Sequence, residues 1–174
     1  MSPHRSRRSL AQLRESYDET LDALRRRFEQ LKAAVVQFEP DLDERTLQAA
    51  WDSDDPLERN RAGGVLANFE KTYMLSMDLV ALSVKIAGRL GAVEDADVSP
   101  LEVLRERGVL SRETEAALVS QRDVRNTSQH IYVELSVSEL RSAVLEQLET
   151  TPRTIRDVTV WVESLEAMET SPEQ

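Results

Sequence analysis

Arg125 and His130 lie five positions apart in the stretch RNTSQHIY, residues 125–132. Arginine carries a planar, permanently charged guanidinium that matches the geometry of a phosphate. Histidine has an ordinary pKa that lets it give and take protons near neutral pH. The pairing therefore points to the cleavage of RNA without a metal ion.

The same spacing also has a purely structural explanation. On a regular α-helix two residues five positions apart diverge by about 140°. His130 would then hydrogen-bond to a helix end, and Arg125 would pair with Asp123 or Glu134. The length of the arginine side chain, or a bend near the motif, would instead bring the Arg125 guanidinium and the His130 imidazole to one phosphate. The spacing leaves both interpretations open.

The composition predicts one soluble globular domain. The chain has 174 residues, of which 40% are hydrophobic and 31% charged. We expect a domain over residues 7–168, with flexible tails over 1–6 and 169–174. A formal net charge of -10 argues against a broad basic surface that coats nucleic acid. It leaves room for a small arginine cluster that binds one phosphodiester, such as Arg122 with Arg125.

Several kinds of site are not expected. The chain has no cysteine, so disulfides and thiolate chemistry are excluded. Its two histidines, His4 and His130, are far apart, and no pair of ligands has metal-binding spacing, so we expect no metal and no cofactor. No signal peptide is visible, and the most apolar run, residues 74–87, is interrupted by Asp78 and Lys85. We therefore expect a cytoplasmic protein that does not span a membrane.

Apolar residues recur mostly every three to four positions, which is typical of α-helices. Ser, Asp and Pro stand where helices should begin, and Gly where they should end. The segment after Pro152 also alternates as in a strand, but we favour helix because a lone strand has no pairing partner. The expected helices cover residues 7–38, 44–51, 57–90, 100–107, 112 to the motif, 136–148 and the segment after Pro152. Gly63-Gly64 would either kink the third helix or delay its start until Val65.

Arg125-Asn126 followed by His130-x-Tyr132, late in a set of long helices, resembles the HEPN superfamily. The hallmark of that family is Arg, four to six residues and then His, often with a polar residue directly after the Arg. The His-x-Tyr ending is similar to the HepT-type toxins, and residues 68–78 are similar to the second long helix of that group. The resemblance covers roughly residues 7–165, but its specific part is the eight-residue motif.

The resemblance implies an all-α, antiparallel, four-to-five-helix up-down bundle that dimerises so that two motifs face each other. It also implies an RNA endonuclease in which His130 is the general acid or base, Arg125 stabilises the transition-state charge and Asn126 orients the phosphate or the histidine. A homodimer would supply the second histidine that acid-base cleavage needs. Glu70 and Asp78 would either face this cleft or have a helix-capping or solvated role.

Tyr132 has a second implied role. In HepT-like toxins this tyrosine is adenylylated by a minimal nucleotidyltransferase that acts as the antitoxin. The added phosphate would block the cleft and neutralise Arg125. Alternatively, the ring of Tyr132 is simply anchored in the interior of the bundle.

Two other functional classes fit the sequence. A related branch of the same fold consists of helical proteins that serve as non-catalytic, substrate-binding partners of nucleotidyltransferases. The remaining alternative is a helical scaffold without chemistry. The sequence does not separate these classes from the ribonuclease toxin.

Overall fold

The computed structural model describes residues 8–94, 99–129 and 135–170, and within these ranges the chain forms six α-helices and no strand. The helices are α1 (Leu10–Val36), α2 (Glu44–Trp51), α3 (Pro56–Arg89), α4 (Pro100–Glu106), α5 (Arg112–Gln129) and α6 (Val137–Thr170). The predicted all-α class is confirmed.

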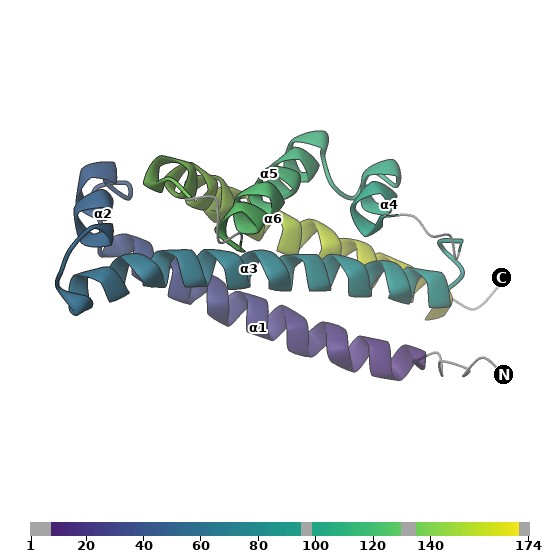
Figure 1. Cartoon of the computed structure of the whole chain (residues 1–174). Helices are drawn as coiled ribbons and strands as arrows, with labels where there is room; N and C mark the ends of the chain where they lie inside the picture. The colour runs from purple at the N-terminus through teal and green to yellow at the C-terminus, as the bar shows by residue number, and fades with distance from the viewer. Residues whose placement is uncertain (1–7, 95–98, 130–134, 171–174) are drawn as a thin grey trace, which may run out of the picture.

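Three long helices form the body of the molecule (Figure 1). α3 runs along the middle, α1 packs beneath it in the opposite direction, and α6 packs behind it. The short α2 covers one end, while α4 and α5 lie over the upper side of α3. α1 and α6 are also antiparallel, since Arg14 near the start of α1 forms a 2.7 Å ion pair with Glu166 near the end of α6.

Local signals set most helix ends. Ser9 and Gln12 form a capping box at the start of α1, with hydrogen bonds of 2.9 and 3.2 Å. Asp55 caps α3 by accepting a 2.9 Å hydrogen bond from the Leu57 N–H, and Pro56 occupies the first turn. The helix is continuous from there, so Gly63-Gly64 does not delay its start. Gly91, just after α3, has φ of 71°, a left-handed conformation that favours glycine.

One sequence prediction about the helices was wrong. We expected a helix to end near Leu148 and a separate segment to follow Pro152, but α6 is a single helix through this proline. Proline removes one backbone donor, which costs the Leu148 carbonyl its partner within the helix. The buried face nevertheless continues on both sides, through Val144, Thr151 and Val158, and this packing outweighs the lost hydrogen bond. α6 also includes residues 169 and 170, which we had placed in the tail.

The core consists of two hydrophobic clusters arranged along the bundle. One contains the first half of α1, up to Leu24, with the second half of α3 and the second half of α6. The other contains α1 from Phe28 onward, α2, the first half of α3 and the start of α6. The boundary therefore falls between Leu24 and Phe28 on α1 and between Val144 and Val158 on α6.

Candidate functional site

The sequence motif begins in the last two turns of α5. Ser111 precedes this helix and accepts a 3.1 Å hydrogen bond from the Thr114 N–H. Apolar and polar residues of the helix are buried toward α3 and α6, and the helix ends at Gln129. Arg125 and Asn126 are therefore placed by the structure, while His130 and Tyr132 lie outside the described residues.

Arg125 is half-buried, and its charge has no local counterion in the part of the chain that the structure describes. Its Nη1 atom lies 3.5 Å from Asn126 Oδ1, and its Nη2 atom lies 4.0 Å from Met74 Sδ on α3. Its Nε atom is buried without a hydrogen-bond partner. Asp123, which the structural interpretation of the motif paired with Arg125, instead lies 3.5 Å from Arg122. Glu134, the other acidic residue of that interpretation, lies outside the described residues. Among the described residues, no carboxylate pairs with the Arg125 guanidinium.

Glu70 on α3 lies beside the motif. The Ser128 hydroxyl is within hydrogen-bond distance of Glu70 Oε1 and 2.6 Å from the Arg125 carbonyl. Gln129 Nε2 donates to Glu70 Oε1 at 3.0 Å. Ser128 and Gln129 therefore tie the last turn of α5 to α3.

The two carboxylates that the sequence raised as possible cleft residues separate in the structure. Glu70 contacts the motif, as described above. Asp78 is exposed and stands eight residues later on α3, about 12 Å further along the helix axis. Of these two carboxylates, only Glu70 lies close enough to the motif to affect the binding of an anion at Arg125.

Tyr73 was missed by the sequence reasoning. Its side chain is buried on α3, and burial raises the pKa of its hydroxyl, while the nearby charges of Arg122 and Arg125 lower it. The hydroxyl thus shares the electrostatic environment of both arginines. The sequence carries no local signal for this proximity, because Tyr73 lies on α3 and both arginines lie on α5.

A buried polar layer lies one helical turn before Arg125. Gln147 Nε2 on α6 donates to the Phe69 carbonyl on α3 at 3.2 Å and to Gln121 Oε1 on α5 at 3.3 Å. Burial raises the pKa of Glu146, and the neighbouring Gln121 side chain lowers it by less. These residues were also missed, although a glutamine at position 121 interrupts the apolar stripe of Ala117 and Leu118.

The arrangement presents one positive charge at a helix end, next to an exposed amide and above a cross-linked polar layer. Such a guanidinium can hold a phosphate or carboxylate by charge-assisted hydrogen bonds.

Within the described ranges, no three His, Cys, Asp or Glu side chains come close enough to hold a metal ion. No described helix has the length and apolar character needed to cross a bilayer. Comparison of the chain with protein-family models, curated proteins and solved structures finds no match.

Proposed function

We propose that the chain is a metal-independent RNA endonuclease, the toxin of a type II toxin-antitoxin pair with a HEPN-like bundle. The observation that carries the proposal is the half-buried guanidinium of Arg125, which has no carboxylate partner among the described residues and stands at the end of α5. Other described arginines also lack an ion pair, but Arg125 is half-buried and its Nε atom has no hydrogen-bond partner. A phosphodiester would supply the missing charge.

The proposed reaction follows from the chemistry of RNA. The ribose 2'-hydroxyl loses a proton to one histidine and attacks the phosphorus, and the 5'-oxygen leaves with a proton from a second histidine. The products are a 2',3'-cyclic phosphate and a free 5'-hydroxyl. Arg125 stabilises the charge that builds up on the phosphoryl oxygens, and Asn126 orients the phosphate or the histidine. A homodimer provides His130 twice, which fits a chain whose other histidine is His4.

The proposed antitoxin is a minimal nucleotidyltransferase that adenylylates Tyr132. The modification would place a phosphate two residues from His130 and near Arg125. The added phosphate would therefore pair with the Arg125 guanidinium, which the RNA phosphate needs for its own binding. Toxicity in cells should then depend on the absence of the transferase.

A second candidate function is a non-catalytic partner module of a nucleotidyltransferase. The Glu70 carboxylate favours this alternative because it lies beside Ser128 and Gln129, where it opposes a bound phosphate. In that case the motif would position a nucleotide or the transferase itself. No RNA would be cut.

The test is the cleavage of a labelled RNA pool by the purified chain in excess EDTA. The variant is His130→Ala, and the matched control is His4→Ala, which removes the other histidine of the chain. Circular dichroism and thermal melting establish equal folding, and sedimentation gives the oligomeric state. Cleavage by the parent and by His4→Ala but not by His130→Ala supports the nuclease. Equal cleavage by all three proteins, or none by the folded dimer, rejects it, and complex formation with a nucleotidyltransferase would then support the partner module.

A further inference from the structure

A groove separates α1 from α6 on the side of α3 that faces away from the motif. Toward one end of the pair the two helices are joined, by the Arg14–Glu166 ion pair and by a 3.4 Å hydrogen bond from the Tyr17 hydroxyl to Thr159 Oγ1. Beyond Thr159 they leave a hollow of about 630 Å³. The residues around it are Arg25, Arg26, Phe28, Glu29, Pro152, Ile155, Arg156, Thr159 and Val160.

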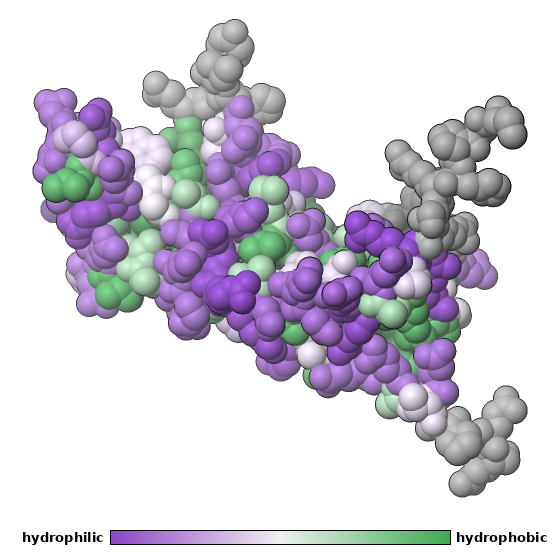
Figure 2. Space-filling view, turned by 90° about the horizontal axis from the view of Figure 1, so that it is seen from below, coloured by the Kyte–Doolittle hydropathy of each residue, from purple (hydrophilic) through white to green (hydrophobic). Residues whose placement is uncertain are grey.

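The position of the groove follows from the core. It lies where the two hydrophobic clusters meet, because Ile155 packs against one cluster and Phe28 belongs to the other. Apolar side chains line the hollow, and Val160 at its edge is 60% exposed. On the face that contains α1, most of the surface is hydrophilic and hydrophobic residues show in small separate patches (Figure 2). The groove therefore offers apolar surface on a molecule whose α1 face is mostly hydrophilic.

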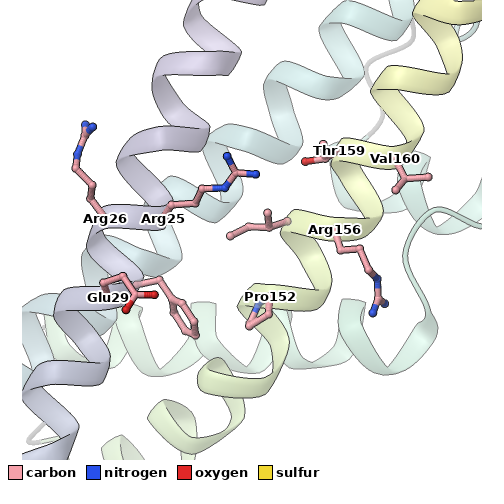
Figure 3. A pocket seen from close by; sticks show the side chains of 9 residues that line it. Arg25, Arg26, Glu29, Pro152, Arg156, Thr159 and Val160 are labelled. Atoms are coloured by element: carbon pink, nitrogen blue, oxygen red, sulfur yellow. The ribbon is translucent and has the colours of Figure 1, made fainter.

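Three arginines surround this apolar floor. Arg25 points across the gap toward α6, while Arg26 and Arg156 diverge outward on its two sides (Figure 3). Arg25 lies 4.0 Å from Asp22, and both side chains are more than half exposed, so this pair contributes little. Arg156 lies 2.9 Å from the partly buried Asp157, while its own side chain is 67% exposed. Glu29, the one acidic residue of the lining, is already 2.6 Å from Lys32. The lining is thus locally positive in a chain of net charge -10.

We propose that this groove binds an acidic amphipathic helix of a partner protein. An amphipathic helix buries its apolar face in a groove through residues at positions i, i+3, i+4 and i+7. Here that face would pack on Phe28, Ile155 and Val160, and acidic residues on its two flanks would meet Arg26 and Arg156. The divergence of those two guanidiniums favours a long ligand with charge on both sides over a single small anion. The apolar floor favours a protein helix over nucleic acid.

This interaction is separate from the proposed nuclease, since the motif lies on α5, across α3 from α1. Loss of RNA cleavage would not affect it, and failure of helix binding would not affect the proposal for Arg125. A partner held in the groove would also leave the end of α5 uncovered.

The test uses a fluorescent helical peptide of about 18 residues, with Leu at the i, i+3, i+4 and i+7 positions and Glu on both flanks. The comparison peptide has Lys in place of every Glu. Fluorescence anisotropy with the full chain should show the acidic peptide binding at least tenfold more tightly than the basic one. In the double variant Arg26→Glu, Arg156→Glu this preference should reverse. The matched control Arg59→Glu, Arg107→Glu, which makes the same charge change on exposed residues outside the groove, should keep it.

A second pair of variants tests the apolar floor. Val160→Asp should weaken the acidic peptide at least tenfold, whereas Val36→Asp, on a valine that is 59% exposed outside the groove, should have no effect. Equal binding by the groove variants and their controls, or no saturable binding, overturns the proposal. Self-association abolished by Val160→Asp would identify a second copy of the chain as the occupant instead. Selective loss of RNA binding in Arg26→Glu, Arg156→Glu would identify nucleic acid.

Discussion

The side-chain amides of Gln147 and Gln121 meet in the core, with Gln147 Nε2 3.3 Å from Gln121 Oε1. Both residues are almost fully buried, and Gln147 also reaches the Phe69 carbonyl. This contact joins α6 to α5 and α3. Since Arg125 stands one helical turn after Gln121, the amide pair fixes the part of α5 from which the arginine projects.

Replacing Gln147 by Leu should destabilise the fold by about 1–3 kcal/mol, because Gln121 Oε1 is then buried without a hydrogen-bond donor. Urea unfolding followed by circular dichroism measures the change. Adding Gln121→Leu should recover part of the loss, since both polar groups are then removed. A double variant whose loss is the sum of the two single losses would show that the amides are not coupled.

Glu146 gives the fold a pH dependence of known sign. Burial raises the pKa of its carboxyl in the folded state, so the folded protein binds this proton more tightly than the unfolded chain does. The contribution of Glu146 to stability is therefore greatest below the ordinary carboxyl pKa and is lost as pH rises through the folded value. Glu146→Gln should stabilise the protein at pH 7 by about 0.5 kcal/mol, a small effect because the side chain is partly exposed.

Unfolding in urea at a series of pH values tests this prediction. The difference between Glu146→Gln and the parent should shrink toward zero under acid conditions. Exposed Glu149→Gln, three residues later on α6, is the control and should show no such trend. If the stability gain from Glu146→Gln grew as the pH fell, the pKa of Glu146 could not be raised in the folded state.

Arg125 should affect the proposed RNA cleavage more than it affects stability. Arg125→Ala removes the transition-state contact and should lower the cleavage rate by about 10²–10³-fold. Arg125→Lys keeps the charge but not the planar fork, so it should recover only part of the rate. Single-turnover cleavage in EDTA gives both values. Arg112→Ala, at the exposed start of the same helix, is the control, and a loss as large as that of Arg125→Ala would remove the special role of Arg125.

Glu70→Gln should strengthen the binding of RNA to the motif by about threefold to tenfold. The substitution removes a negative charge near the phosphate, and one such charge interacts by about 1 kcal/mol at 4 Å in water. The amide can still accept hydrogen bonds from Ser128 and Gln129, so the end of α5 should stay in place. Binding to the catalytically blocked His130→Ala protein is measured by fluorescence anisotropy at two salt concentrations.

Asp78→Asn is the matched control for Glu70→Gln, because it removes a charge from an exposed position further along the same helix. It should change RNA binding much less. Equal effects of the two substitutions would indicate a general response to net charge and would contradict a local role for Glu70.

The helices themselves were largely predictable. Their periodicity and their local start and stop signals act within a few residues, as at the Asp55-Pro56 start of α3 and the left-handed Gly91 after it. The Ser9–Gln12 box of α1 was not foreseen, since we expected that helix to begin at residue 7. Because such signals are local, the sequence predicted a break at Pro152, where the local rule was overridden by packing on both sides of the proline.

The candidate site could be predicted only in part. The sequence selected Arg125 and Asn126 by residue type and spacing, but the contacts around them come from α3. Ser128 reaches Glu70 across 58 positions of the chain, and Gln147 reaches Phe69 across 78. Such contacts depend on how two helices pack, and a pattern of periodicity 3.6 carries no information about which turn of one helix faces which turn of another.

The sequence by itself thus determined an all-helical chain and the Arg125 motif, because helix formation and capping are governed by neighbouring residues. The tertiary structure decided which charges remain uncompensated. It placed the Arg125 guanidinium beside Met74 of α3 without a described counterion, and opened a groove lined in part by arginines between α1 and α6. Charge pairing and burial are set by the distances between packed elements, and those distances exist only once the helices are assembled.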